Sequence, residues 1–292
     1  MSVNSSSSCL ERGPWLSAHI HYHEDLDRLL RRCVGPLVAR LGDRVAPCGV
    51  YFLRYWQGGP HLRLRLRSAD LATIGSLRAV TEESLHRFLR ADPSRRPMSP
   101  AVYRLTAAAF AAVERGIDPI EDLLPDNTVR FHDFTPEHIP GADQQHPAPL
   151  AFYEQSSRVV LSVLERPAPA ARRTRLALAH CAAAMGAVAD DDDRRAELAA
   201  WTYDSWAAQL LGAHRRDIEV RFAERVAGLE SVVRRAIDRH TGAAEEPWRS
   251  AVRNVPADRL SLAYCLHTHC NRLGINLIEE AYIWFLLRWA LT

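Results

Sequence analysis

The stretch that most limits how this chain can fold is residues 48–67, CGVYFLRYWQGGPHLRLRLR. The turn residues Gly58, Gly59 and Pro60 predict a hairpin, because paired glycines accept the positive φ angles that short hairpin loops need. After the turn, leucines alternate strictly with basic residues, which predicts a strand with one buried face. On the preceding strand, Arg54 falls on the face of Val50 and Phe52. The basic side of the second strand consists of His61, Arg63, Arg65 and Arg67.

Two interpretations of this basic side stay open. Charged rows on a sheet are commonly solvated and paired with nearby carboxylates. Arginine also presents a rigid fork of donors that suits carboxylate and peptide oxygens, so the same row could bind an anionic or carbonyl-rich ligand. The residue types alone do not separate the two.

The elements around the hairpin predict an α+β fold. Residues 15–23 alternate as a first strand, and a helix is expected to about residue 41, followed by the hairpin and by a helix over about 68–89. Helices should cover the leucine side of an antiparallel sheet. If the first strand joins that sheet, His19 and His21 extend the basic row. A strand is expected at 128–134, and helices at 100–116, 149–165, 168–187, 193–211, 216–240, 257–273 and 277–290.

The order of these elements predicts a sheet-bearing N-terminal half and a mainly helical C-terminal half. No internal repeat or long linker divides them, so we expect one domain over residues 1–292, with a flexible tail at 1–14. The net charge of +2 argues against nucleic acid as a partner. No run approaches the about 20 apolar residues that a membrane span requires. The scattered cysteines and the absence of a secretory signal favour the cytoplasm.

A second concentration of polar residues is AYCLHTHCNRLG, residues 263–274. On a helix, Tyr264, His267 and Asn271 share one face, while His269 and Arg272 lie together on another side. Zinc is disfavoured although Cys265, His267, His269 and Cys270 crowd together, because residues two apart on a helix diverge by about 200°. A cysteine nucleophile beside a histidine, or plain core hydrogen bonding of His267 and Asn271, stays open. No glycine-rich loop leads from a strand into a helix, so no nucleotide cofactor is implied.

Four segments together resemble a known family, the glutamate-elimination domains of lantibiotic dehydratases, which include stand-alone thiopeptide-type bacteriocin biosynthesis proteins. FLRYWQGGPHLRLR is similar to their FIRY-x-GGPHLRLR hairpin, and HTHCNRLG is similar to their H-x-H-x-NRL-G helix. Residues 134–157 partly resemble their middle motif, in which PE-x-x-RYGG is followed by an acidic residue and a Ser-Ser pair. WLSAHIHY also fits. The four segments span residues 15–274 in the family's order.

The resemblance implies roles for particular residues. In elimination domains, two strand arginines, the middle-motif arginine and the helix histidine hold a glutamylated Ser or Thr and help to expel glutamate. Arg63 and Arg65 match the strand arginines, and His267 matches the histidine. The motif arginine, however, is Pro140 here, which has neither charge nor donor. The substrate-binding set that the resemblance implies is Arg54, His61, Arg63, Arg65, Glu137, Glu154, Ser157 and Asn271.

The same departure is typical of the pyridine synthase branch of the family. The resemblance therefore implies a cofactor-independent enzyme that joins two dehydroalanines of a leader-bearing ribosomal peptide by a formal aza-[4+2] cycloaddition. Water and the leader then leave, and a pyridine macrocycle remains. His267 and Tyr264 are expected to assist proton transfer, with Tyr282 and Tyr153 as further candidates. Other thiopeptide maturation enzymes are expected partners.

Two other functions compete with cycloaddition. One is a glutamate-elimination subunit of a split Ser/Thr dehydratase, which would act beside a separate glutamylating protein. The other is a catalytically inactive family member that binds the leader and scaffolds other maturation enzymes. Release of glutamate from a glutamylated peptide would indicate the first, and tight leader binding without turnover would indicate the second.

Overall fold

The computed structural model describes residues 13–44, 49–113, 122–135, 137, 147–189, 191–210, 212–226, 228–238, 246–253, 255–256 and 258–292. Most of the expected tail at 1–14 therefore lies outside the described residues. The chain divides into two compact units, and the boundary falls within helix α5 (Pro147–Leu164). Unit 1 comprises Met1–Glu137 and Ser157–Pro167, and unit 2 comprises His138–Ser156 and Ala168–Thr292. The single-domain assignment stays a prediction.

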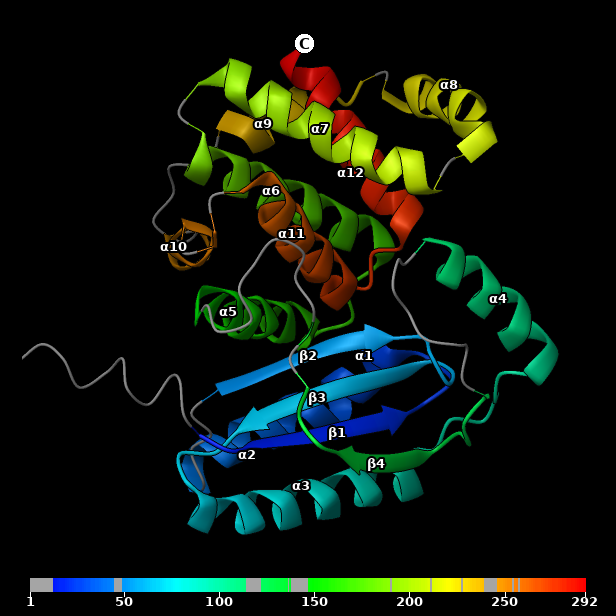
Figure 1. Ribbon diagram of the computed structural model, residues 1–292, viewed down its shortest axis with the longest axis vertical. Helices are drawn as coiled ribbons and strands as arrows, with labels where there is room; N and C mark the ends of the chain where they lie inside the picture. Colours follow the sequence, from blue (N-terminus) through cyan, green and yellow to red (C-terminus); the bar gives the residue numbers. More distant parts are fainter. Residues whose placement is uncertain are drawn as a thin grey trace, which may run out of the picture. The chain divides into compact units, whose positions relative to one another are not determined.

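Unit 1 is built on a four-stranded antiparallel sheet in the order β2-β3-β1-β4 (Figure 1). Its strands are β1 (Trp15–His21), β2 (Gly49–Tyr55), β3 (His61–Arg67) and β4 (Thr128–His132). The hairpin and both other expected strands are confirmed. Gly58 and Gly59 have φ angles of 75° and 102°, as the turn requires.

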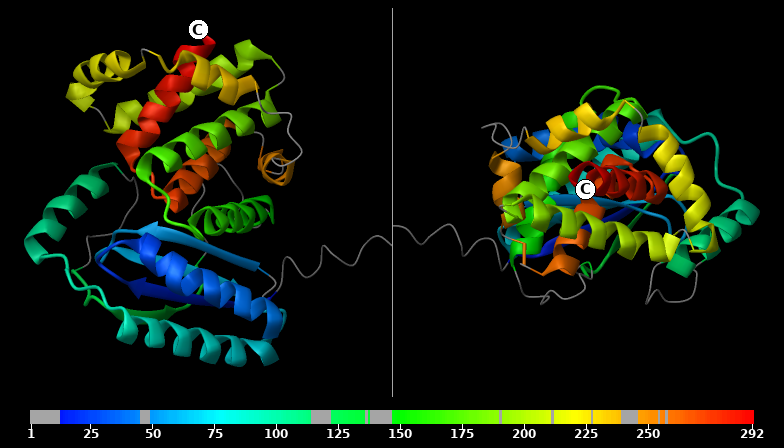
Figure 2. Two further views of the ribbon diagram at one scale, coloured as in Figure 1. Left: turned by 180° about the vertical axis from the view of Figure 1, so that it is seen from behind. Right: turned by 90° about the horizontal axis from the view of Figure 1, so that it is seen from above.

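The register of the sheet separates an apolar face from a polar one. Residues directly opposite each other share a face, and β1 places His19 opposite Arg63 and His21 opposite His61. The prediction that both histidines extend the basic row of β3 is therefore confirmed. On the other face the three leucines of β3 are fully buried. Helices lie over one side of the sheet (Figure 2), namely α1 (Leu26–Leu29), the π-helical turn η1 (Leu30–Val34), α2 (Gly35–Arg44) and α3 (Leu71–Ala91).

The open edge of the sheet is protected at β2. An edge strand exposes unpaired backbone groups that invite aggregation. Here the backbone N–H of Phe52 donates to Oγ of Ser157 on α5, at 3.2 Å. Helix α4 (Pro100–Val113) packs beside the hairpin, where its Phe110 ring stacks on Trp56 with centroids 5.4 Å apart.

Unit 2 is helical in its described residues. Its helices are the first part of α5, then α6 (Ala170–Val188), α7 (Asp192–Leu210), the short η2 (Gly212–His214), α8 (Arg215–Val226), α9 (Glu230–Asp238), α10 (Glu246–Arg253), α11 (Arg259–Leu273) and α12 (Leu277–Leu291). The expected continuous helix over 216–240 is wrong. Gly228 adopts a left-handed φ of 84° between α8 and α9, which ends the first helix. Helix α10 was not expected from the sequence.

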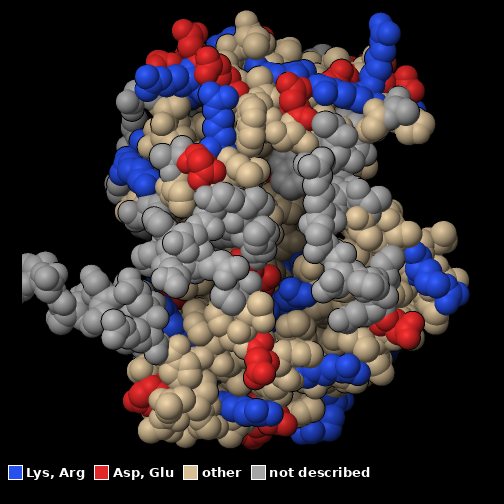
Figure 3. All heavy atoms as spheres, viewed as in Figure 1, with Lys and Arg blue, Asp and Glu red and all other residues tan. Residues whose placement is uncertain are grey.

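The sheet with covering helices in unit 1 and the helical remainder confirm the α+β class. None of the described helices combines the length and the hydropathy that crossing a bilayer requires. Both charge signs are interspersed over the visible face (Figure 3), in keeping with the small net charge. Electrostatic recognition must therefore come from local groups.

Candidate active site

The arginine cluster, defined as Arg63, Arg65 and Glu137, lies on the polar face of the sheet in unit 1. One carboxylate bridges both cations, with Nη2 of Arg65 at 3.2 Å from Oε1 of Glu137 and Nη1 of Arg63 at 3.5 Å from Oε2. Arg65 also donates from Nη1 to Oγ of Ser17 on β1, at 2.7 Å. The bridge fixes both guanidinium groups, so they are pre-organised rather than free to rotate.

The arginine cluster keeps unused donors. Nε of Arg63 and Nε of Arg65 are buried and have no hydrogen-bond partner among the described residues. The Arg63 guanidinium also lies 3.4 Å above the centroid of the Tyr55 ring, a cation–π contact that holds it against β2. Arg65 is only 3% exposed and is therefore not solvated, whereas the Arg63 side chain is 19% exposed. Carboxylate pairing and spare donors coexist, so one further acceptor, such as a peptide carbonyl, would be complementary.

Neutral histidines flank the arginine cluster. His61 donates from Nδ1 to the carbonyl oxygen of Gly59 at 2.9 Å, because that oxygen can only accept, and this leaves Nε2 as the acceptor nitrogen. Burial lowers the pKa of His61 to about 3. The charges of Arg63 and Arg65 contribute to this decrease, whereas the hydrogen bond to Gly59 opposes it. Burial likewise lowers the pKa of His21 to about 4. Both imidazoles are therefore uncharged at neutral pH and can act as bases or acceptors.

Arg54 does not lie with the arginine cluster. It is opposite Leu62 in the register, on the leucine face. Its Nη2 is 2.5 Å from Oδ1 of Asp27 on α1, and both side chains are largely buried. Ion pairing beneath the sheet explains its position, so its predicted role in substrate binding has no support from its placement.

The histidine pair, defined as His267 and Glu280, lies in unit 2. Nδ1 of His267 on α11 is 2.8 Å from Oε2 of Glu280 on α12. Glu280 is 1% exposed, whereas the His267 side chain is 18% exposed. Tyr264 and Asn271 are half-buried on the same predicted face, with the Tyr264 ring 6.0 Å from the His267 ring. This face of α11 thus carries a carboxylate-oriented imidazole beside a phenol, a combination suited to proton transfer.

The other side of α11 carries a buried hydrogen-bond chain. Arg272 donates from Nη1 to Oγ of Ser156 at 3.2 Å, and Oγ of Ser156 is 2.8 Å from Nδ1 of His269. Nε2 of His269 is in turn 2.9 Å from Nδ1 of His180 on α6. Arginine can only donate, so Ser156 accepts from Arg272, whereas the direction of the Ser156–His269 and His269–His180 bonds depends on the tautomer of His269. Burial keeps the pKa of His269 well below its usual value, which is consistent with neutral rings.

The remaining candidates are placed apart from the histidine pair. Tyr153 is buried, and the Arg272 guanidinium lies 4.3 Å from the centroid of its ring. Tyr153 therefore belongs with the buried hydrogen-bond chain of Arg272. Tyr282 faces α8, where its ring is 4.9 Å from Phe222. Glu154 is buried on α5. Ser157 belongs to unit 1, where it receives the Phe52 N–H. Only Tyr264 and Asn271 therefore share the His267 face.

The thiols on α11 do not behave as nucleophiles. Cys265 and Cys270 are fully buried. Burial raises the pKa of the Cys265 thiol to about 12, and the hydrogen bond with Cys181 together with burial raises the pKa of Cys270 well above its usual value. A reactive thiolate at neutral pH is therefore not supported. His267 and His269 point to different partners, so they do not converge with these sulfurs on one point.

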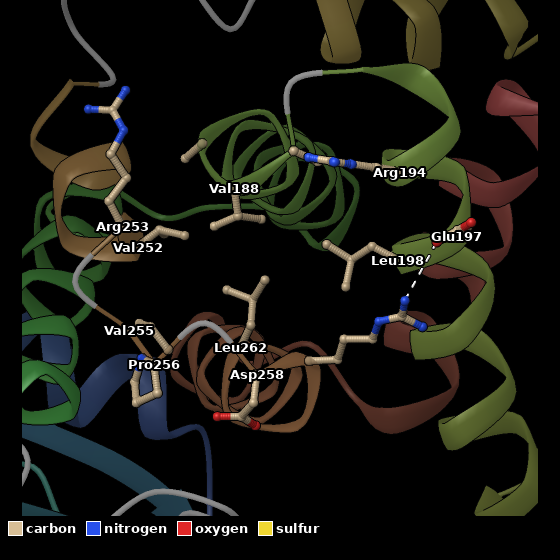
Figure 4. Close-up of a pocket in the computed structure, with 13 residues that line it drawn as sticks. Val188, Arg194, Glu197, Leu198, Val252, Arg253, Val255, Pro256, Asp258 and Leu262 are labelled. Atoms are coloured by element: carbon tan, nitrogen blue, oxygen red, sulfur yellow. Dashed lines mark ion pairs between the residues drawn. The ribbon is translucent and has the colours of Figure 1, made fainter.

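A pocket of about 430 Å³ lies elsewhere in unit 2, where α6, α7, α10 and α11 meet (Figure 4). Val188, Leu198 and Leu262 line it, and an Arg259–Glu197 ion pair of 3.5 Å closes one side. None of the predicted site residues lines it. Its size therefore does not identify the site of chemistry.

Glu280 and the buried partners Ser156 and His180 were missed by sequence reasoning. Glu280 follows a helix stop at Gly274 and a helix start at Asn276, so the sequence does indicate two consecutive helices. Which residue of the second faces His267 depends on how the two helices pack. No local pattern contains that information.

Residues 15–291 match the family model described as "Lantibiotic biosynthesis dehydratase C-term". The fold is similar to that of the solved structure titled "Pyridine synthase, TbtD, from thiomuracin biosynthesis", with a TM-score of 0.79 at 20% identity over 95% of this chain and 97% of that chain. It is also similar to the tRNA-dependent lantibiotic dehydratase MibB from Microbispora sp. 107891, with a TM-score of 0.56 at 18% identity. That match covers 99% of this chain and 28% of MibB.

A third solved structure, TsrL, has a TM-score of 0.56 at 14% identity over 96% of this chain and 94% of its own. At these identities the structural matches establish a shared fold. A comparison with curated protein sequences finds no match.

Proposed function

Because the chain belongs to the family of lantibiotic biosynthesis dehydratase C-terminal domains, we propose that it is a pyridine synthase of thiopeptide biosynthesis. It would catalyse a formal aza-[4+2] cycloaddition between two dehydroalanines of a leader-bearing ribosomal peptide. Loss of water and of the leader would then leave an aromatic pyridine in a macrocycle. The family membership itself confirms the resemblance found in the sequence.

The observation that carries this proposal is the near end-to-end match with a pyridine synthase. That structure covers almost the whole of this chain and is itself almost wholly covered, at the higher TM-score of 0.79. The dehydratase has a TM-score of 0.56 and only 28% of its chain is matched. Proline at position 140, where elimination domains carry an arginine, supports the same choice, since proline cannot hold a glutamyl carboxylate.

The chemistry asks mainly for positioning and modest proton transfer. Bringing two alkenes of one peptide together is a proximity problem, which fixed donors can solve. One dehydroalanine must react with its neighbouring amide as the iminol, so a proton moves from the amide nitrogen to the oxygen. His267 would move such protons, with Tyr264 nearby as a second donor and acceptor. These groups also suit the proton transfers that expel water and the leader amide.

The arginine cluster would hold the peptide. Its two Nε–H donors have no hydrogen-bond partner among the described residues and suit carbonyl or carboxylate oxygens of the substrate. His61, with its acceptor Nε2, would add a neutral contact. The proposed partners are therefore the leader and core of a modified precursor peptide, together with other maturation enzymes, in the cytoplasm.

The test is turnover of a leader-bearing peptide that already contains azoles and dehydroalanines. Wild-type protein should split it into a macrocycle and an amidated leader, and His267→Ala should reduce the rate by about 10²-fold or more, the usual contribution of a general acid or base. His214→Ala, at an exposed histidine of the same unit, is the matched control. Macrocycle formation at the wild-type rate by His267→Ala would remove His267 from the mechanism.

Glutamate elimination is the second candidate, because both strand arginines of elimination domains are present as Arg63 and Arg65. The same mass-spectrometric assay separates the two functions. Release of free glutamate from a glutamylated precursor, with formation of dehydroalanine, would favour elimination and overturn the cycloaddition proposal.

A further inference from the structure

We propose that Glu280 is a positioning residue for His267: its buried carboxylate holds the imidazole in the tautomer protonated on Nδ1 and so makes Nε2 the nitrogen that exchanges protons with the substrate. This inference rests on the proposed function, in which His267 transfers protons. It extends that function by naming the group that fixes the state of His267.

The local sequence holds the two residues in register. Gly274 ends α11 in a left-handed conformation with φ of 73°, and its N–H bonds back to the carbonyl oxygens of Asn271 and Cys270. Two residues later, Asn276 caps α12 and forms a capping box with Glu279. A stop and a start separated by one residue leave little freedom between the helices. Glu280 therefore returns to the His267 face of α11.

The Glu280 carboxylate fixes the tautomer of His267 because an ionised carboxylate cannot donate a hydrogen bond. An ionised carboxylate only accepts hydrogen bonds, so the 2.8 Å contact requires the proton to be on Nδ1 of His267. Nε2 of a neutral ring then carries the lone pair. When His267 takes up a proton, the adjacent negative charge stabilises the imidazolium that results. The contact thus orients the ring and favours the charged intermediate.

The burial of Glu280 points to a functional reason for its presence. The residue is 1% exposed, and its second oxygen, Oε1, is buried without a hydrogen-bond partner among the described residues. Burying a carboxylate with one unsatisfied oxygen is unfavourable for folding. An apolar residue would fill this site on α12 at lower cost, so the carboxylate is better explained by what it does to His267.

The decisive variant is Glu280→Gln, which keeps the size of the side chain. The glutamine amide can donate to Nδ1 as well as accept from it, so the ring can adopt the tautomer protonated on Nε2. We expect kcat for macrocycle formation to fall by about 10²-fold, with KM within about twofold of the wild-type value. Glu280→Asp, which keeps the acceptor-only group, should recover part of the lost rate.

Two further variants separate positioning from general effects. Glu279→Gln removes the same charge from the same first turn of α12, where carboxylates interact favourably with the helix dipole, but Glu279 contacts Asn276 instead of His267. It should leave kcat near the wild-type value. In the double variant His267→Ala/Glu280→Gln, the loss of kcat should not exceed that of His267→Ala alone, because both changes disable the same proton-transfer group.

Nitrogen-15 NMR of histidine-labelled full-length protein gives a readout that does not depend on turnover. The His267 signals are assigned by their loss in His267→Ala. Wild-type protein at neutral pH should show a proton on Nδ1, and Glu280→Gln should show a shift towards Nε2 protonation. A wild-type ring protonated on Nε2, or an unchanged kcat in Glu280→Gln, would overturn the inference. If wild-type protein forms no macrocycle but the NMR result holds, the proposed function fails while the Glu280–His267 assignment stands.

Discussion

Replacing Ser156 with alanine tests the buried hydrogen-bond chain on the inner side of α11. The Ser156 hydroxyl is fully buried and joins two groups, as acceptor from Nη1 of Arg272 at 3.2 Å and as partner of Nδ1 of His269 at 2.8 Å. Without it, Nδ1 of His269 loses its hydrogen-bond partner in a buried site. Nη1 of Arg272 keeps its contact with Oγ1 of Thr268, also at 3.2 Å.

The magnitude follows from these two contacts. A donor or acceptor left unpaired in the interior costs about 1–3 kcal/mol, and a hydrogen bond from a charged donor contributes about 1.5–3 kcal/mol. Because Arg272 can still donate to Thr268, only part of the hydrogen-bond contribution of Arg272 is lost. We therefore expect Ser156→Ala to lower the free energy of unfolding by about 2–4 kcal/mol. With a urea m-value of about 2 kcal/mol/M, the midpoint of unfolding should fall by about 1–2 M.

Urea unfolding followed by circular dichroism measures this shift, and hydrogen exchange of the α11 amides shows whether the loss is local to the chain. Ser162→Ala is the matched control, since Ser162 is an exposed serine on the same helix whose hydroxyl donates only to the carbonyl of Val159. A Ser156→Ala midpoint within 0.3 M of the control, on the order of the scatter expected for a surface substitution, would refute the reasoning that the chain stabilises unit 2.

Two further predictions concern pH and the faces of the sheet. Burial lowers the pKa of His180 to about 4 and keeps the pKa of His269 well below its usual value, so the unfolded state binds more protons than the folded state below pH 6.5. Stability should therefore be complete above pH 6.5 and fall towards pH 4 by up to about 1.4 kcal/mol per pH unit for each histidine, measured as urea midpoints at pH 7, 6 and 5; a flat profile contradicts neutral buried rings. Arg65→Ala should lower kcat/KM at least about tenfold. Arg54→Ala should leave kcat within about twofold and destabilise the fold by about 3 kcal/mol, because it breaks a largely buried ion pair with Asp27. Equal losses of activity in the two variants would contradict their placement on opposite faces.

The sequence by itself determined the parts of this protein that depend on neighbouring residues. Alternation in β3 and the Gly58–Gly59 turn specified the hairpin, because side-chain direction in a strand has a period of two. The spacing of Tyr264, His267 and Asn271 specified a shared helix face for the same kind of reason. The motifs carried enough of the family pattern to identify its fold and membership.

Other features depended on which segments meet. Pairing with β3 and burial against α1 placed Arg54 beneath the sheet, although its sequence neighbours resemble a binding motif. The break at Gly228 was invisible because helical periodicity continues across it, and a left-handed glycine is recognised only from its backbone. Glu280, Ser156 and His180 gained their partners through helix packing. Contacts between residues far apart in sequence have no local period, so only the tertiary structure could decide them.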